Sequence, residues 1–147
     1  MKGEILNILL VEDNEDHAEL VQRSLEENQV ANRIYWVQDG EEALDYLYQR
    51  GTYADKTKSP CPHLILLDLR LPKIDGLEVL KTIKTDEKLK SIPVVVLTSS
   101  ESEQDIGKVY AFHANSYLVK PLDFEKFTKL MRDLGFYWLG WNVNPLQ

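Results

Sequence analysis

The chain has 147 residues, of which 44% are hydrophobic, and this is enough for one compact domain with a single core. Its 24 acidic and 17 basic side chains give a net charge of −7, which argues against binding to nucleic acid or an anionic membrane. Cys61 is the only cysteine, which excludes a disulfide framework and a cysteine-based zinc site. Neither a signal peptide nor a membrane span is visible, so we expect a cytoplasmic protein.

The first half of the chain alternates short apolar segments with helical patterns. Residues 5–11 are nearly all apolar and predict a buried strand, and apolar spacing from 16 to about 27 predicts an amphipathic helix. Residues 33–37 alternate and are rich in β-formers, which predicts an edge strand, and a helix follows at 39–47. The stretch 51–62 contains Gly, Lys, Ser and two prolines without periodicity, so we expect a long loop there.

The second half of the chain continues the alternation. Residues 64–67 are apolar on both faces, which is typical of a central parallel strand. The remaining predicted elements are a helix after Asp75 and Gly76, a strand at 93–97, a helix from 99 to about 113, a strand at 116–119 and a last helix from near 123. The chain therefore consists of a strand followed by a helix, five times.

This repeated order predicts a doubly wound α/β fold. Parallel strands joined by right-handed helical crossovers give a five-stranded parallel sheet with helices on both faces. In such folds, ligands bind beyond the carboxyl ends of the strands, where the strand order reverses. The residues that end or follow each strand are therefore the candidate site residues.

Charged and hydroxyl side chains stand at four of the five predicted strand ends: Glu12 and Asp13, Asp68, Thr98 and Lys120. Clustered carboxylates repel each other unless a cation joins them. Oxygen ligands without His or Cys favour Mg²⁺ or a similar hard divalent ion. A nearby lysine indicates that a further negative group binds, and a phosphoryl group fits, with Mg²⁺, Lys120 and the Thr98 hydroxyl on its oxygens.

Each of these residues also has an ordinary structural explanation. An aspartate after a strand is most often a turn or capping residue. Thr98, with Ser99 or Ser100, fits a helix cap, and Lys120 fits solvated surface. The occurrence of all of them at successive strand ends is much less expected by chance than any one alone, which favours a shared site.

Four sequence blocks occur in order and at fitting separations: 8–14 (ILLVEDN), 66–76 (LLDLRLPKIDG), 93–99 (PVVVLTS) and 120–121 (KP). Together they resemble the receiver domains of bacterial two-component response regulators, over about residues 5–130. This resemblance implies the flavodoxin-like receiver fold with strand order 2-1-3-4-5.

The resemblance also implies a phosphoacceptor and a metal site. Asp68 is the expected phosphoacceptor, whose carboxylate attacks a phosphohistidine of a sensor histidine kinase. Glu12 and Asp13 are expected to hold Mg²⁺, and Asp68 and the backbone carbonyl of Arg70 complete the protein ligands. Glu12 stands where many members carry Asp, which is an accepted variant in the family.

Further residues match positions that respond to phosphorylation. Lys120 is expected to pair with the phosphoryl group and Thr98 to turn inward and hydrogen-bond it. Tyr117 matches the aromatic switch position, which changes rotamer as Thr98 moves. In the family, the peptide bond before Pro121 is cis.

Two more positions match places that tune the lifetime of the acyl phosphate. Arg70 and Ser100 lie two residues beyond Asp68 and Thr98, and in the family such side chains border the attacking water. We hypothesise that Arg70 screens or polarises the phosphoryl group.

The C-terminal end departs from an ordinary receiver. We assign residues 1–134 to the receiver domain and 135–147 to a C-terminal extension, which is too short for a separate output domain. Its aromatic residues are Phe136, Tyr137, Trp138 and Trp141. These side chains either fold back over the domain's own core or form an apolar patch between two copies. This layout resembles stand-alone response regulators of cyanobacterial phytochromes, which implies a homodimer through the last helix and tail.

The expected function is a phosphorylation-controlled switch that signals through protein–protein interaction, with at most weak self-phosphorylation and self-dephosphorylation. One alternative is a Mg²⁺-dependent phosphohydrolase of the haloacid-dehalogenase type. Its signature needs a second aspartate where this chain has Arg70, and a cap insertion that is missing. The other alternative is a receiver-fold binding module that is never phosphorylated, and the intact Asp68, Thr98 and Lys120 argue against it.

Overall fold

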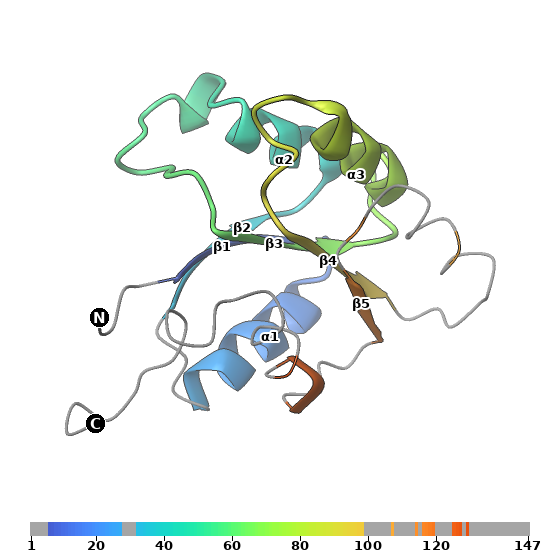
Figure 1. Ribbon diagram of the computed structural model, residues 1–147. Helices are drawn as coiled ribbons and strands as arrows, with labels where there is room; N and C mark the ends of the chain where they lie inside the picture. The colour runs from blue at the N-terminus through green and yellow to red at the C-terminus, as the bar shows by residue number, and fades with distance from the viewer. Residues whose placement is uncertain are drawn as a thin grey trace.

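The computed structural model describes residues 6–27, 32–98, 107, 114, 116–119, 125–127 and 129. Its strands are β1 (Leu6–Val11), β2 (Asn32–Val37), β3 (Leu64–Asp68), β4 (Val94–Thr98) and β5 (Ser116–Val119). Its helices include α1 (Glu15–Glu27), α2 (Gly40–Leu47), α3 (Gly76–Thr85) and a short 3-10 helix, η1 (Gly51–Tyr53). The strands form one parallel sheet in the order β2-β1-β3-β4-β5 (Figure 1), which confirms the predicted fold and the edge position of residues 33–37.

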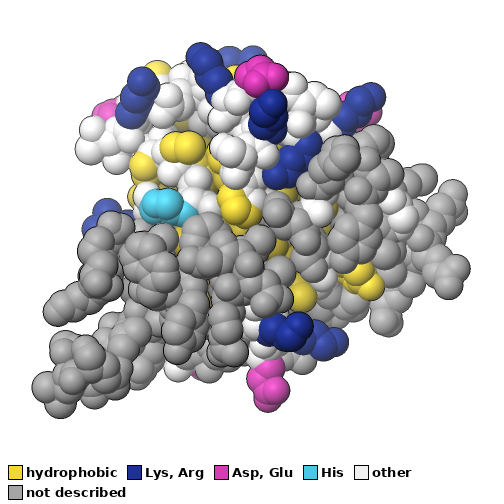
Figure 2. Space-filling view, viewed as in Figure 1, with side chains coloured by type: hydrophobic (Ala, Val, Ile, Leu, Met, Phe, Trp, Pro, Cys, Tyr) yellow, Lys and Arg dark blue, Asp and Glu magenta, His cyan; other side chains and the backbone are white. Residues whose placement is uncertain are grey.

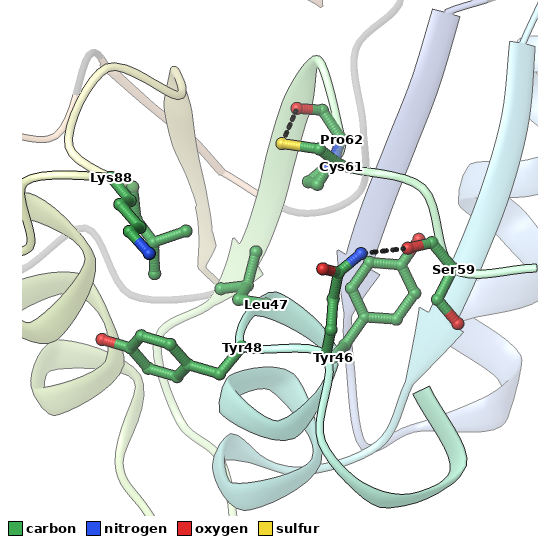
Figure 3. Close-up of a pocket in the computed structure, with 9 residues that line it drawn as sticks. Tyr46, Leu47, Tyr48, Ser59, Cys61, Pro62 and Lys88 are labelled. Atoms are coloured by element: carbon green, nitrogen blue, oxygen red, sulfur yellow. Dashed lines mark hydrogen bonds between the residues drawn. The ribbon is translucent and has the colours of Figure 1, made fainter. Parts of the chain in front are cut away.

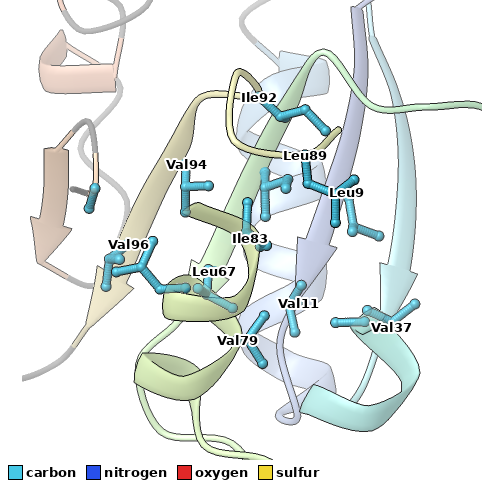
Figure 4. Close-up of a cluster of buried hydrophobic side chains, with 14 of the residues drawn as sticks. Leu9, Val11, Val37, Leu67, Val79, Ile83, Leu89, Ile92, Val94 and Val96 are labelled. Atoms are coloured by element: carbon cyan, nitrogen blue, oxygen red, sulfur yellow. The ribbon is translucent and has the colours of Figure 1, made fainter. Parts of the chain in front are cut away.

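The sheet is covered on both faces. In Figure 1, α1 lies against one face, and α2 and α3 lie against the other. Side chains alternate along β1, so that Leu6, Ile8 and Leu10 join the apolar cluster on the α1 face, whereas Leu9 and Val11 join the other. Figure 4 shows this second cluster between the sheet and α3. Burial on both faces explains why the central strands are apolar throughout.

The helices bury one stripe each, as their apolar spacing predicts. Val21 and Leu25, four residues apart, are buried on α1. Phe127, in a helical segment, is fully buried in the cluster on the α1 face, so this segment covers that face together with α1. None of the helices in the described part of the chain combines the length and apolarity needed to cross a membrane.

Several predicted boundaries were wrong by one residue. The strand predicted at 64–67 continues to Asp68, and the strand predicted at 93–97 spans Val94–Thr98. Backbone pairing continues where the apolar pattern stops, because Asp68 pairs with Leu97 and Thr98 pairs with Val119. Most of the two helices predicted from 99 and from near 123 lies outside the described residues.

The prediction of an irregular loop at 51–62 was incomplete, because this segment contains η1 and is attached to α2. The hydroxyl of Tyr46 donates to the carbonyl of Pro60 at 2.8 Å, and the hydroxyl of Tyr53 donates to the carboxylate of Glu42. Burial raises the pKa of both tyrosines, and the bond to Glu42 raises the pKa of Tyr53 further. The tyrosines therefore give the loop a fixed course over α2.

Candidate functional site

Three carboxylates meet where β1 and β3 end. Glu12 and Asp13 follow β1, and Asp68 is the last residue of β3. The parallel register pairs Val11 with Leu67, so Glu12 and Asp68 come next to each other at the same edge of the sheet. One carboxylate oxygen from each of the three residues lies within 4.8 Å of the others. The structure thus brings together the three acidic residues that the sequence predicted.

The environment of these carboxylates differs. Glu12 is 1% exposed and Asp68 is 7% exposed, whereas Asp13 is exposed. Carboxylates at such short separations repel each other strongly where solvation is poor, and a divalent cation offsets this repulsion. Carboxylate oxygens are the ligands that Mg²⁺ prefers in proteins, so the donor set fits such an ion.

Hydrogen bonds hold the backbone N–H, the backbone carbonyl and the side chain of Glu12. Its backbone N–H donates to the carbonyl of Val37 at 3.0 Å, and its carbonyl accepts from the indole N–H of Trp36 at 2.7 Å. The side-chain oxygen Oε2 accepts from the backbone N–H of Asn14 at 3.1 Å. Nδ1 of His17, in the first turn of α1, lies 3.9 Å from the same oxygen. The backbone and side chain of Glu12 are therefore fixed by β2 and by the start of α1.

Asp68 is held by the loop that follows it. The backbone N–H of Arg70 donates to Oδ1 of Asp68 at 3.2 Å, which orients the carboxylate. Gly76 begins α3 against this strand end, and its N–H donates to the carbonyl of Leu69 at 3.1 Å. A Cβ on Gly76 would lie 2.4 Å from the carbonyl oxygens of both Asp68 and Leu69, so glycine is required for this approach.

Thr98 ends β4 on the same edge of the sheet. It lies one residue beyond Leu97, the partner of Asp68, and is 3% exposed. Tyr117, on β5, pairs with Val96 and is half-buried against the apolar cluster that faces α2 and α3. Thr98 thus lies on β4, the strand next to β3, and Tyr117 lies on β5, one strand further, and the roles of both residues stay predictions.

Other predicted site residues are described only in part. The side chain of Arg70 is exposed, and the metal-ligand role of its carbonyl stays a prediction. Lys120, Ser100 and Pro121 lie outside the described residues. The same is true of the aromatic residues of the tail, Phe136, Tyr137, Trp138 and Trp141.

Sequence reasoning missed several residues that support the site. The apolar pattern assigned Trp36 to an edge strand, but it gave no sign of the bond from its indole to Glu12. The position of Asn14 carried a usable signal, since its Oδ1 accepts from the N–H of His17 at 3.0 Å and an Asn three residues before a helical N–H is a common cap. Gly76 was predicted to precede a helix and is the first residue of α3, but its close approach to Asp68 is a tertiary contact that the pattern did not indicate.

A cavity lies away from the carboxylates. It has a volume of about 250 Å³ and lies between the C-terminal end of α2, the loop that contains Cys61, and Lys88 (Figure 3). Burial raises the pKa of the Cys61 thiol, which lowers the thiolate fraction at neutral pH. This direction agrees with the assignment of Cys61 as an ordinary loop residue.

The surface around the helices carries both signs of charge. In Figure 2, acidic side chains lie among the basic ones over the layer of α2 and α3. This arrangement differs from the segregated basic surface by which proteins bind the nucleic-acid backbone.

The fold and site together define a doubly wound α/β domain whose oxygen ligands fit a hard divalent cation.

Comparison with known proteins identifies the family. The profile of the response regulator receiver domain matches residues 8–132. The probable methanogenesis regulatory protein FilR2 of Methanothrix harundinacea is 49% identical over 140 residues, which cover 94% of this chain and 86% of that protein. Response regulator Rcp1 of Synechocystis is 43% identical over 132 residues, which cover 90% and 88%. The chain belongs to the response regulator receiver family.

Solved structures agree with this assignment. The bacteriophytochrome response regulator AtBRR superposes with a TM-score of 0.82 at 47% identity, over 95% of this chain and 99% of that one. The Mn²⁺-bound form of Rcp1 gives 0.74 at 42% identity, over 95% and 97%. The phosphorylated cyanobacterial phytochrome response regulator RcpA gives 0.75 at 42% identity, over 91% and 94%. Receiver domains bind a divalent metal and take a phosphoryl group from a donor such as a histidine kinase, so the chain is a signalling protein and not a conventional enzyme.

Proposed function

We propose that the chain is a phosphorylation-controlled switch in which Asp68 accepts a phosphoryl group from the phosphohistidine of a sensor histidine kinase. The observation that carries the proposal is the approach of the Glu12, Asp13 and Asp68 carboxylates within 4.8 Å, with Asp68 and Glu12 buried. Carboxylates are not gathered in this way at one edge of a sheet for stability, because their mutual repulsion opposes folding. A cation and a bound phosphoryl group give the arrangement a purpose.

The chemistry that this site would support is phosphoryl transfer to a carboxylate. A Mg²⁺ ion held by Glu12, Asp13 and Asp68 would supply positive charge beside the carboxylates and the phosphoryl oxygens. A carboxylate oxygen of Asp68 forms a bond to phosphorus while the bond from phosphorus to the histidine nitrogen breaks, and the imidazole leaves with that electron pair. The product is an aspartyl phosphate. The N–H of Arg70 on Oδ1 sets the plane of the attacking carboxylate.

The proposed response to phosphorylation runs through β4 and β5. The phosphoryl oxygens add acceptors next to the hydroxyl of buried Thr98, and Lys120 is the cation that we propose to pair with them. A shift of Thr98 changes the space available to half-buried Tyr117 on the neighbouring strand. A partner that prefers one of the two arrangements then reads the signal.

The lifetime of the phosphoryl group is proposed to depend on Arg70 and Ser100. The exposed Arg70 side chain starts from a backbone that is bonded to Asp68. If Arg70 screens or polarises the phosphoryl group, Arg70→Ala changes the dephosphorylation rate. An unchanged rate would remove this role.

The proposed phosphodonor is a sensor histidine kinase, with a phytochrome as the first candidate. AtBRR and RcpA are named as response regulators of bacteriophytochrome and cyanobacterial phytochrome, and both align over more than nine-tenths of this chain. FilR2, a probable methanogenesis regulator, is also similar. Relatives with different inputs are therefore similar to this chain, and similarity alone does not identify the kinase. Transfer of a phosphoryl group from a phosphorylated phytochrome kinase to this chain tests whether such a kinase is the donor.

We also propose that residues 1–134 form the receiver domain and that residues 135–147 form a C-terminal extension. Two copies of the chain are proposed to associate through the last helix and this extension. Phe136, Tyr137, Trp138 and Trp141 support this proposal, because Tyr and Trp are enriched at interface centres. Light scattering at micromolar concentration, with and without beryllofluoride as a phosphoryl mimic, tests it. A monomer under both conditions would exclude the dimer.

The phosphoacceptor role is tested by intact mass. The protein is incubated with Mg²⁺ and acetyl phosphate, in parallel with Asp68→Asn. We expect one added phosphoryl group in the wild-type protein and none in the variant. Rapid hydrolysis of acetyl phosphate without an adduct would instead indicate a hydrolase of the haloacid-dehalogenase type. No adduct and no hydrolysis, in a protein that binds Mg²⁺, would indicate a binding module.

A further inference from the structure

Trp36 holds the peptide group that joins the two acidic residues after β1. Its indole N–H donates to the carbonyl of Glu12 at 2.7 Å, across 24 positions of sequence. Strands β1 and β2 end at Val11 and Val37, so this carbonyl lies beyond their paired residues. A side chain, rather than another strand residue, therefore supplies its donor.

This bond controls the direction of both carboxylates because the peptide group is planar. The carbonyl of Glu12 and the N–H of Asp13 belong to one rigid unit, so fixing the carbonyl oxygen also fixes the Cα of Asp13. The other side of Glu12 is fixed by the bond from its N–H to Val37 at 3.0 Å. Asp13 itself is exposed, so burial contributes little to fixing its position. Its placement beside the buried Glu12 and Asp68 thus depends on the backbone.

We propose that Trp36 is a positioning residue for the divalent-metal site, acting through the peptide group between Glu12 and Asp13. The inference rests on the proposed function, since that function assigns the metal to these carboxylates. Residues that orient metal ligands without touching the metal commonly change metal affinity by about 10-fold to 100-fold when replaced. The indole bond to a backbone carbonyl places Trp36 at the low end of this range.

The alternative role for Trp36 is packing alone. Its ring is half-buried and contacts the apolar cluster on the α1 face, as does Ile34 two residues earlier on the same strand. Trp36→Phe keeps an aromatic ring and removes the N–H. Ile34→Val removes one methylene from the same face of β2 and leaves the indole bond intact. These two variants separate positioning from packing.

The test measures binding of Mg²⁺ alone by titration calorimetry, together with thermal unfolding of the metal-free proteins. We expect Trp36→Phe to raise the Kd for Mg²⁺ about 10-fold, and Ile34→Val to lower the unfolding temperature while the Kd stays within 2-fold of wild type. An unchanged Kd in Trp36→Phe would overturn the proposal. So would a Kd that rises equally in both variants, because that result would follow from packing.

A spectroscopic readout gives an independent check. We expect Mg²⁺ to change the tryptophan emission of the wild-type protein and to leave that of Trp36→Phe unchanged, although Trp138 and Trp141 remain. A metal-dependent change of equal size in both proteins would count against Trp36. Titration of Asp13→Asn separates the metal site of the proposed function from the positioning role of Trp36. Loss of Mg²⁺ binding in Asp13→Asn supports the metal site, and Mg²⁺ binding that Asp13→Asn leaves intact would overturn both the metal site and the role of Trp36.

Discussion

The loops that follow β1 and β3 border the three carboxylates of the site, and they are held in different ways. The loop after β1 is fixed by bonds to Glu12 from β2 and from the next turn of chain: its N–H to Val37, its carbonyl to Trp36 and its side chain to Asn14. These bonds are made at a residue that is 1% exposed. Moving this loop would break several bonds in a poorly solvated place.

The loop after β3, residues 69–75, begins at buried Leu69, and its outer part packs against the start of α2. The N–H of Gly40 donates to the carbonyl of Pro72 at 3.4 Å, and a Cβ on Gly40 would lie 2.0 Å from the carbonyl oxygen of Ile74. Lys73 has a positive φ of 66° and lies 3.6 Å from a carboxylate oxygen of Asp39. Close backbone contact and exposed charges thus replace buried side-chain bonds.

This difference corresponds to the different tasks of the two loops in the proposed mechanism. Glu12 and Asp13 are proposed to keep the same metal throughout, whereas Asp68 changes from a carboxylate to an acyl phosphate. The outer part of the loop after β3, which is held by exposed charges, can adjust to that change at small cost, and a loop held by buried bonds keeps its ligands in place. Four perturbations test this contrast.

The largest effect is expected at Gly76, where the loop after β3 meets α3. In Gly76→Ala, the new methyl group meets two backbone carbonyl oxygens, and neither can move without displacing the end of β3. We expect a loss of about 3 kcal/mol in the free energy of unfolding, measured by urea denaturation without metal. Gly107→Ala is the control, because it lies in a helix and a Cβ there meets nothing within 4 Å. Equal stability of the two variants would refute the close contact.

The second effect is the linkage of the two loops by a metal. An ion bound by Glu12, Asp13 and Asp68 connects both loops, so its binding stabilises the folded protein. At about 100 times its Kd, Mg²⁺ should raise the free energy of unfolding by about 2.7 kcal/mol. Amide hydrogen exchange in residues 69–75 should slow at the same time. Asp13→Asn is expected to lose both effects, and their persistence in that variant would place the ion elsewhere.

The sequence was sufficient to predict the sheet and the meeting of the three carboxylates. Buried apolar runs and the repeated strand–helix order gave the sheet, and parallel strands place their carboxyl ends at one edge. The convergence of Glu12, Asp13 and Asp68 follows from those two facts. The ends of β3 and β4 were predicted one residue short, because Asp68 and Thr98 are polar but still pair with their neighbours.

The supports of the two loops could not be predicted in the same way. Trp36 and Glu12 are 24 positions apart, and the indole bond depends on the strand register that places Trp36 opposite Leu10, two residues before Glu12. The contact of Gly40 with Ile74 depends on the packing of α2 against the loop after β3. Single-sequence patterns report burial and local turns, whereas these contacts depend on the relative placement of whole elements.

A third and smaller effect is expected at Asn14, in the loop after β1. Its Oδ1 accepts from the N–H of His17, which satisfies one donor at the start of α1. Asn14→Ala should lower the free energy of unfolding by about 1 kcal/mol. The backbone bond from residue 14 to Glu12 remains, so the Kd for Mg²⁺ should change by less than 2-fold. Asn14→Asp keeps an acceptor and should restore stability, and failure to do so would exclude the capping role.

The smallest effect is expected at Lys73, on the exposed side of the loop after β3. Its ammonium group is paired with Asp39 and Glu41, at 3.6 Å from each, and such exposed pairs contribute little. Asp39, and then Glu41, raise the pKa of Lys73 above its ordinary value of 10.5. A base whose pKa is raised by folding stabilises the protein below its unfolded pKa and loses that contribution as pH rises through the folded pKa.

Lys73→Gln should therefore shift the urea midpoint less than Asn14→Ala does at pH 7. The difference from wild type should vanish in 1 M salt, and it should decline above pH 10.5 and disappear only as pH rises through the raised pKa of Lys73. A difference that survives both conditions would mean that Lys73 supports the loop through packing. A loss of stability larger than that of Gly76→Ala would reverse the contrast, because exposed charges and not backbone contact would then hold the loop after β3.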